Sequence, residues 1–373
     1  MSIDGQLFIR HFEDYCPLWL AEEGDPVGLH IGTLDKPLQR IMMTLDVRPE
    51  VVTEAIEKGV DLIIAKHPPI FRPIQRLVPT DLQTKMYMDL VKHDIAVYAA
   101  HTNMDIIWDG LNDWFCEELG VEVQDFLKET HQVRWKKLAV SVPEEDAGKL
   151  RAALAEAGAG EQGNYRATSF SSNGIGRFTP VNGAKPAIGS LNHPEEVHEE
   201  KVEVLFAETI ENDVLTAMKK VHPYEEIAYD VFSLDNAPQT FGIGRIGQLS
   251  KPMETEQFVQ KVKEVFKLDG LRIVQPHPAK KWIQTVAICG GTGGNLYTEA
   301  LRKKADVYIT GDVYYHTAHD MQTNGLTVID PGHHIEVLCI SKFVEKMLKW
   351  KEELDWQVDI IPSEVNTNPF EFR

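Results

Sequence analysis

The chain has few cysteines and no paired arrangement of them. Four occur among its 373 residues, with no CxxC spacing, and each lies inside an otherwise apolar stretch. Cysteine in such surroundings behaves as a small buried hydrophobic residue. We therefore expect buried thiols, and no disulfide framework, at Cys16, Cys116, Cys289 and Cys339.

Long hydrophobic runs and a secretory leader are also missing. A membrane-spanning helix needs a run of about 18 or more apolar residues, and the sequence has none. The first residues, MSIDGQLFIRHFEDY, do not place a basic segment before an apolar one, as a secretory signal would. We expect a cytoplasmic protein that does not cross a membrane.

Positive charge is scarce relative to negative charge. The 38 lysines and arginines face 57 aspartates and glutamates, for a formal net charge of −19. Such a surface repels phosphate backbones and anionic lipids, which argues against nucleic acid polymers and membranes as partners. A small anion can still bind in a locally positive pocket, for example beside a bound metal ion. We expect a small-molecule substrate or effector.

What the sequence does contain is the ordinary composition of a globular protein, and enough of it for two or three domains. Hydrophobic residues make up 43% and charged residues 25%, a balance that excludes disordered and fibrous chains. Apolar runs suited to buried parallel strands alternate with helical patterns, which predicts an α/β fold. The expected strands and helices of the first part lie at 41–47, 49–59, 61–65, 80–94 and 95–100.

The same alternation resumes near the end of the chain, with a helix over 254–266, strands over 283–289, 305–310 and 326–330, and a last helix reaching about residue 351. This pattern indicates one α/β layer that is split along the chain. The sequence between the two parts has a different pattern. It predicts the order strand, helix, strand, strand, helix, strand, which suits a ferredoxin-like insert. We therefore expect a first half over 1–130, an insert over 131–235 and a second half over 236–373.

Histidines and carboxylates follow three of the expected strands. His67 comes after the strand at 61–65, and His101 with Asp105 comes after 95–100. His333 with Glu336 comes after 326–330. Ligands of open α/β sheets bind beyond the carboxyl ends of strands, so we expect these groups to converge at one sheet edge. Imidazole with carboxylate suits Zn, Fe or Mn, whereas calcium prefers oxygen alone.

Each of these groups taken alone has a simpler explanation. A histidine at a strand end is often only hydrogen-bonded, His333 to Glu336 could be an ordinary helix start, and Asp105 could be a helix cap. Three such groups at one edge favour a metal site. Asp312 and His316, four residues apart after another strand, could have a supporting or substrate-binding role. The loop GGTGGN could cradle an anion, but tight packing explains its glycines better.

Six segments in order along the chain resemble signature blocks of the NIF-three-like family, also called GTP cyclohydrolase 1 type 2 homologues. They read GDPVGLHIG, KHPPIF, HTNMD, GGTGGN, ADVYITGDVYYH and PGHHIE. The resemblance implies two similar α/β halves around a dinuclear metal site and assembly into a homohexamer. It also implies the metal ligands His67, Asp105, His333 and Glu336, and an insert, with HPYEE, of the nitrogen-regulator and copper-tolerance type.

One departure from the family pattern affects the metal site. The family has two adjacent histidines where this chain has Lys66 and His67. Protonated lysine is not a metal ligand, so one or two ions are possible. The resemblance favours a metal-dependent hydrolase acting on a nucleotide-like or heterocyclic molecule, with Lys66, His101, Asp312 or His316 assisting. The alternative is a non-catalytic metal-binding regulator whose insert binds a partner or effector.

Overall fold

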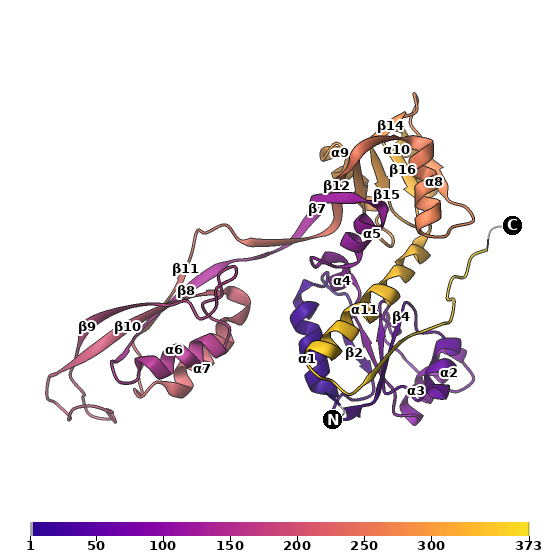
Figure 1. Ribbon diagram of the computed structural model, residues 1–373. Coiled ribbons are helices and arrows are strands. Elements are labelled where there is room, and N and C mark those ends of the chain that lie inside the picture. The colour runs from indigo at the N-terminus through magenta and orange to yellow at the C-terminus, as the bar shows by residue number, and fades with distance from the viewer. Residues whose placement is uncertain (1–2, 372) are drawn as a thin grey trace. The chain divides into compact units, whose positions relative to one another are not determined.

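The computed structural model describes residues 3–371 and 373, and it has a mixed α/β fold with several sheets. The chain divides into two compact units (Figure 1). Unit 1 joins Met1–His131 to Phe241–Arg373, and unit 2 is Gln132–Thr240. All four cysteines are buried free thiols, which confirms that expectation.

The first sheet of unit 1 has five strands in the order β17-β4-β5-β6-β2. Its centre is parallel: β4 (Arg40–Thr44), β5 (Leu62–Ala65) and β6 (Ala96–Ala99) run in one direction. At the edges, β17 (Asp359–Pro362) is parallel to β4, and β2 (Gly28–Ile31) is antiparallel to β6. Every residue of β5 and β6 is buried, which explains why their sequences are apolar without alternation.

The second sheet of unit 1 has six strands in the order β13-β16-β15-β14-β12-β7. The parallel strands are β14 (Trp282–Ile288), β15 (Val307–Ile309) and β16 (Thr327–Asp330). Antiparallel β13 (Arg272–Val274) pairs with β16, and antiparallel β12 (Gln239–Glu254) pairs with β14. The last strand in the order is β7 (Val121–Val133).

The expectation of a single split α/β layer is therefore wrong, because the two segments build separate sheets. Each sheet also takes a strand from the distant part of the chain: β17 joins the first sheet and β7 joins the second. These pairings connect residues more than one hundred positions apart, and Ile360 and Ile41, which pair in the first sheet, are more than three hundred positions apart. Periodicity within a short window carries no information about them.

A shared hydrophobic core joins one face of each sheet. Ile41 and Met43 of the first sheet and Val286 and Ile288 of the second belong to it, together with Phe343. Residues of alternate parity face outward, so Met42 contacts a separate cluster. Helices that contribute to the shared core include α1 (Gly5–Tyr15), α5 (Leu111–Leu119), α8 (Thr255–Val265) and α11 (Leu338–Glu353).

The outer faces of the two sheets are covered by other helices. Residues of α2 (Pro49–Glu57) and α3 (Leu82–Lys92) pack on the first sheet, and those of α9 (Tyr297–Arg302) and α10 (Tyr315–Thr323) on the second. Pro49 begins α2 and the Asp81 carboxylate caps α3, as their local sequences predict. The remaining elements of unit 1 are β1 (Ile3–Asp4), β3 (Pro37–Leu38), α4 (Thr102–Ile106), η1 (Leu18–Leu20), η3 (Gly294–Leu296) and η4 (His333–Val337).

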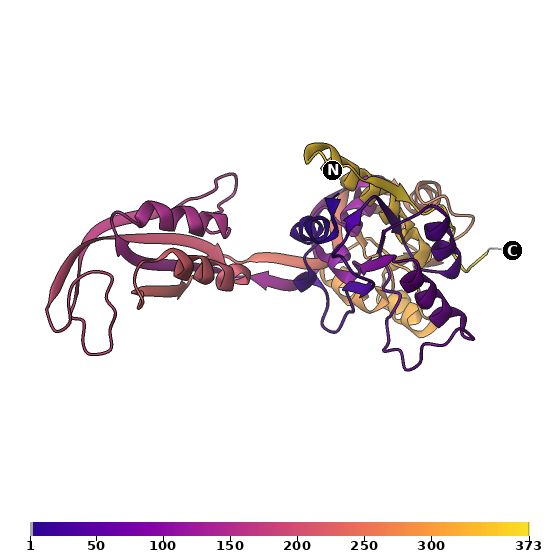
Figure 2. The same cartoon turned by 90° about the horizontal axis from the view of Figure 1, so that it is seen from below.

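Unit 2 has one antiparallel sheet in the order β11-β8-β10-β9 with two helices. Its strands and helices follow the order β8, α6, β9, β10, α7, β11, and Figure 2 shows β9 and β10 extending beyond the helices. Leu138, Val140 and Val142 lie in its core because alternate residues of a strand share a face. The bounds are β8 (Trp135–Pro143), α6 (Ala147–Glu156), β9 (Phe170–Phe178), β10 (Glu195–Ala207), η2 (Glu208–Ile210), α7 (Glu211–Val221) and β11 (Tyr229–Ser233).

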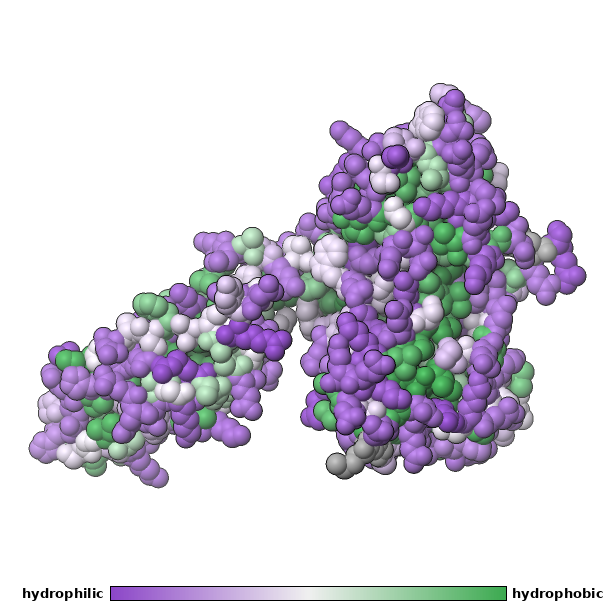
Figure 3. Space-filling view, viewed as in Figure 1, coloured by the Kyte–Doolittle hydropathy of each residue, from purple (hydrophilic) through white to green (hydrophobic). Residues whose placement is uncertain are grey.

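Hydrophilic residues cover most of the visible face of both units, as Figure 3 shows. Within the described part of the chain, no helix combines the length and hydrophobicity needed to cross a bilayer.

Candidate metal centre

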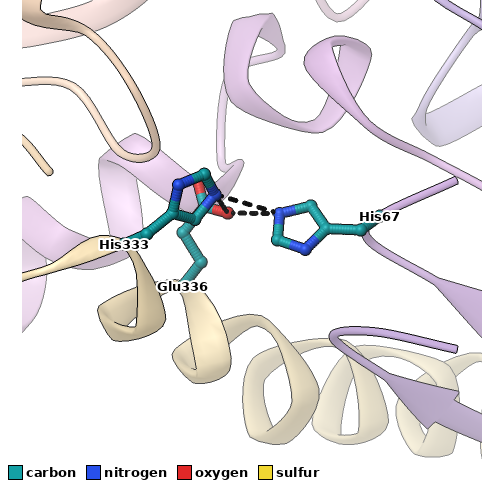
Figure 4. A group of neighbouring side chains, drawn as sticks. All are labelled: His67, His333 and Glu336. Atoms are coloured by element: carbon teal, nitrogen blue, oxygen red, sulfur yellow. Dashed lines mark hydrogen bonds and ion pairs between the residues drawn. The ribbon is translucent and has the colours of Figure 1, made fainter. Parts of the chain in front are cut away.

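Three side chains, from both sequence segments of unit 1, lie close together. His67 follows β5, and His333 and Glu336 belong to η4, which comes directly after β16 (Figure 4). The Nε2 atoms of the two histidines are 3.3 Å apart. The Oε2 atom of Glu336 lies 2.9 Å from His67 Nε2 and 3.3 Å from His333 Nε2. These three atoms form a triangle of groups that could hold a metal ion.

The triangle fits a divalent transition-metal ion. Two ligands that are each about 2.1 Å from an ion, at angles between right and tetrahedral, stand about 3.0 to 3.4 Å apart. The observed separations of 2.9 to 3.3 Å match that range. His67 and His333 are 22% and 35% exposed, whereas Glu336 is 2% exposed. An ion held here would be anchored on the protein side and open to solvent on the other.

A carboxylate holds the other nitrogen of each histidine. His67 Nδ1 donates to Asp46 Oδ1, and His333 Nδ1 donates to Asp312 Oδ2, both at 2.7 Å. A proton kept on Nδ1 leaves the Nε2 lone pair for a metal ion, which is the usual arrangement around metal-binding histidines. Thr367 and Thr292 in turn donate to Asp46 and Asp312. Both rings are therefore fixed in a ligating orientation.

His101 has the same kind of support but stands beside the triangle. Its Nδ1 donates to Asp25 Oδ1 at 2.7 Å, and the backbone amide of Thr102 donates to Asp25 Oδ2 at 3.0 Å. The His101 ring packs edge-on against that of His67, with ring centres 5.8 Å apart. The ring of Phe71 contacts it as well. His101 is thus an oriented imidazole next to the proposed ion position.

Lys66 points the opposite way from its neighbour His67, into the protein. Its side chain is 1% exposed, and its Nζ donates to Asp105 Oδ2 at 3.0 Å. The same Nζ lies 3.8 Å from Glu336 Oε2. The other oxygen of Asp105, Oδ1, is buried without a hydrogen-bond partner among the described residues. Lys66 and the metal-ligating triangle therefore share one carboxylate, Glu336.

The buried charges shift one another's pKa values. Burial alone would lower the pKa of Lys66, but Asp105 and Glu336 outweigh that effect and raise it above its ordinary range. Burial raises the pKa of Asp105, although Lys66 opposes the shift. Burial also acts to raise the pKa of Glu336, but Lys66 and the two histidines hold it well below its ordinary value. Lys66 and Glu336 are consequently both charged near neutral pH.

The glycines of the loop after β14 make room for Glu336. A Cβ atom on Gly290 would stand 2.9 Å from Glu336 Oε1, and one on Gly291 would stand 3.1 Å from the same atom. The side chain of Asn112 ties this loop to the segment of Asp105: its Oδ1 accepts from the Gly290 amide, and its Nδ2 donates to the Asp105 carbonyl. Close packing, the preferred explanation of GGTGGN, is what these contacts show.

The structure thus brings together three of the four expected ligands. His67, His333 and Glu336 meet, whereas Asp105 lies beside Lys66. Asp312 supports His333. His316 is exposed on α10, where its ring contacts that of Tyr315. The expectation that these groups converge at the edge of a single sheet is wrong. His67 and His101 follow strands of the first sheet, whereas His333 follows a strand of the second.

Sequence reasoning missed Asp25 and Asp46. Asp46 comes two residues after β4, a parallel strand of the first sheet, so the strand-end rule that selected His67 would also have selected it. Asp25 lies in the segment between η1 and β2, away from any parallel strand. Its pairing with His101 joins residues 76 positions apart and has no local signal.

Metal binding should depend on pH, because the ligands hold protons in the metal-free protein. The hydrogen bond to Glu336 raises the pKa of His333 to about 9 against the effect of burial, and Asp312 adds to the rise. An ion must displace the Nε2 proton, so we expect proton release and an apparent affinity that rises about tenfold per pH unit for each proton released, up to pH near 9. Calorimetry in buffers of different ionisation enthalpy measures the released protons. An affinity that stays flat between pH 6.5 and 8.5 would contradict this expectation.

Known proteins resemble this chain over nearly its whole length. The family model described as Duf34/NIF3 (NGG1p interacting factor 3) matches residues 3–369. The chain belongs to the Duf34/NIF3 family. A relative from Bacillus subtilis (strain 168), named GTP cyclohydrolase 1 type 2 homolog, is 44% identical over 371 residues, which is 100% of this chain and 99% of the relative.

Two solved structures share the fold of this chain. The crystal structure of a Bacillus cereus protein related to NIF3 has a TM-score of 0.89 and 39% identity, and the match covers 100% of both chains. The crystal structure of the Staphylococcus aureus protein SA1388 has a TM-score of 0.79 and 26% identity, covering 100% of this chain and 99% of that one. The similarity spans unit 1 and unit 2 alike.

Proposed function

We propose that this chain is a metal-dependent hydrolase whose ion is held by His67, His333 and Glu336. The observation that carries the proposal is the triangle of ligating atoms, which is closed by protein on one side and open on the side of the half-buried histidine rings. A saturated structural site would have a fourth protein ligand, whereas catalytic ions keep a position for water or substrate. We favour Zn, Fe or Mn because the ligands combine imidazole and carboxylate.

The chain's own residues supply orientation and proton transfer. A divalent ion bound here would lower the pKa of a bound water and polarise the bond under attack. Asp25 keeps the proton of His101 on Nδ1, so Nε2 is free to accept a proton near the ion. Asp46 and Asp312 keep the two ligating rings in place throughout.

The proposed substrate is a small nucleotide-like or heterocyclic molecule. The curated relatives named GTP cyclohydrolase 1 type 2 homolog support a heterocycle, and the net charge of −19 disfavours polymers. An ion held at the triangle would activate water, which suits hydrolysis of a ring or an ester bond. Beside the triangle, the ring of His101 contacts the rings of His67 and Phe71, and such an aromatic group suits a flat substrate.

The test is turnover by the His101→Gln variant. We expect the metal-loaded wild type to hydrolyse at least one member of a panel of GTP, related heterocycles and phosphoesters. We expect the variant to lose about 10² to 10⁴ in kcat, the usual contribution of a general acid or base, with its metal content unchanged. His316→Gln, at an exposed position on α10, is the matched control and should keep full activity.

Two outcomes of this experiment would count against the proposal. If the fully loaded wild type turns over nothing in the panel, the non-catalytic regulatory alternative is favoured. If His101→Gln keeps its kcat while activity is present, His101 is not the proton-transfer residue. Measuring the pH profile alongside separates a lost proton-transfer group from a general loss of fold, because only the former removes a limb of the profile.

We also propose that unit 2 is a ferredoxin-like module and that the two sheets of unit 1 form two similar halves. The order of strands and helices in unit 2, with neighbours β11-β8-β10-β9, supports the first point. The three-stranded parallel centre of each sheet in unit 1 supports the second. Assembly as a homohexamer, implied by the family resemblance, stays a prediction, as does the cytoplasmic location.

A further inference from the structure

Lys66 is the chemically unexpected residue of the centre. It comes directly before a metal-ligating histidine, yet its side chain turns inward and is 1% exposed. Its nitrogen lies between two carboxylates, 3.0 Å from Asp105 Oδ2 and 3.8 Å from Glu336 Oε2. A buried cation held between two carboxylates, next to a site for a divalent cation, raises the question of how many ions the centre accepts.

We propose that the centre holds a single divalent ion, and that the ammonium group of Lys66 takes the place of a second cation between Asp105 and Glu336. This inference rests on the proposed metal centre at His67, His333 and Glu336. It deepens that proposal because it sets the number of ions and therefore the class of mechanism: one ion activates water and polarises the substrate, without a paired ion to hold the leaving group.

Space supports the inference first. An ion bound by both carboxylates would lie about 2.1 Å from one oxygen of each. The Lys66 nitrogen already stands 3.0 Å from the Asp105 oxygen and near the Glu336 oxygen, so the same volume cannot hold both. The ammonium group carries three donors and no lone pair, so it cannot serve as a ligand to an ion that displaces it.

Charge supports it as well. Two carboxylates buried together need a compensating positive charge, because an unpaired buried charge costs several kcal/mol. Lys66 supplies that charge permanently, without the need to capture a metal ion. Glu336 Oε2 then faces a cation on each side: the ammonium at 3.8 Å, and the ion position that it shares with His67 and His333. Glu336 is therefore a bridging carboxylate between the Lys66 ammonium and the single metal ion.

The unpaired oxygen of Asp105 indicates what the site would do without the lysine. Asp105 Oδ1 is buried and accepts no hydrogen bond from any described residue. With Lys66 replaced by histidine, both Asp105 and Glu336 would be free to bind an ion, and the new imidazole would supply a neutral ligand in place of the ammonium. The chain would then offer a second set of three ligands directly beside the first.

The test is the number of metal ions per chain in the wild type, in Lys66→His and in the double variant Lys66→His with Asp105→Asn. Each protein is loaded with excess Zn²⁺, dialysed, and measured by elemental analysis and native mass spectrometry, with circular dichroism to show that it is folded. We expect one ion in the wild type, two in Lys66→His, and one in the double variant, because the second ion needs the Asp105 carboxylate.

The outcomes separate this inference from the proposed metal centre. No ion in the wild type would overturn the centre itself, and the inference with it. Two ions in the wild type would overturn only the inference. One ion in a folded Lys66→His variant would show that the lysine is not what excludes the second ion.

A measurement on the wild type alone covers the case in which Lys66→His fails to fold. Loaded with Mn²⁺, a centre with one ion gives the six-line electron paramagnetic resonance spectrum of isolated Mn²⁺. That spectrum at one ion per chain is the expected result. The signals of an exchange-coupled pair would overturn the inference.

Discussion

Glu336→Gln is expected to abolish stoichiometric metal binding and to destabilise the metal-free protein by about 3 to 5 kcal/mol, the usual cost of removing one partner of a buried ion pair. The carboxylate is 2% exposed and is shared by His67, His333 and Lys66. Its amide analogue carries no charge, so the ion loses an anionic ligand and the ammonium of Lys66 keeps Asp105 alone.

Elemental analysis after metal loading and chemical denaturation of the metal-free protein measure the two effects separately. The matched control is Glu345→Gln, which makes the same chemical change at an exposed position of α11 and should alter neither quantity. A Glu336→Gln protein that retains one tightly bound ion per chain would contradict the assignment of the triangle as the metal centre.

Arg245→Met is expected to be the most destabilising single change outside the metal centre, lowering the free energy of unfolding by about 3 to 5 kcal/mol. Arg245 lies on β12 and is fully buried. Its Nε and Nη2 atoms donate to the two oxygens of Asp113 at 2.7 and 2.6 Å. Its guanidinium also stacks on Trp108 and Phe126.

The same guanidinium also stabilises the segment that carries Asp105. It donates to the carbonyls of Ile106 and Ile107, at the end of the short helix α4 that carries Asp105. Methionine fills a similar volume but removes the guanidinium donors from these carbonyls and leaves Asp113 with only the Gly110 amide as a donor among the described residues. Such losses cost most when the groups are buried. Arg245→Lys keeps the charge but loses the two-pronged contact, so we expect an intermediate effect.

Thermal unfolding followed by circular dichroism measures the effect of Arg245→Met, for which we expect Tm to fall by roughly 10 °C. Arg302→Met is the control, because its side chain is 64% exposed and pairs with nearby Glu299 at the surface. Surface changes of this kind shift Tm by no more than about 2 °C. Equal Tm values for the two variants would refute the structural role assigned to Arg245.

Local sequence was a good guide to elements whose patterns are local. The buried parallel strands were expected from continuous apolar runs, and β5 ends at Ala65, where the run ends. The helix expected over 254–266 is α8 (Thr255–Val265). By contrast, β12 was not expected, because its segment is rich in glycine. A Cβ on Gly242 would collide with the carbonyl of Lys128, so close approach of β7 requires glycine there.

The candidate metal centre, too, was predictable from sequence only in part. The strand-end rule selected His67, His333 and Glu336 from sequence, because the carboxyl end of a parallel strand is recognisable from the run that precedes it. It selected Asp105 by the same logic. Tertiary structure alone decided that the Asp105 carboxylate pairs with Lys66, since that depends on which way a buried side chain turns.

The amino-acid sequence by itself determined the family, the α/β class, the free thiols and the residue types available for metal binding, because motif, composition and periodicity are properties of short segments. Tertiary structure decided that two sheets rather than one supply the centre, and that Asp46 and Asp312 orient the ligating rings. It also decided that a lysine lies between two buried carboxylates. These features arise from contacts between residues that are far apart in the chain, and their energies depend on burial and distance, which appear only when the chain is folded.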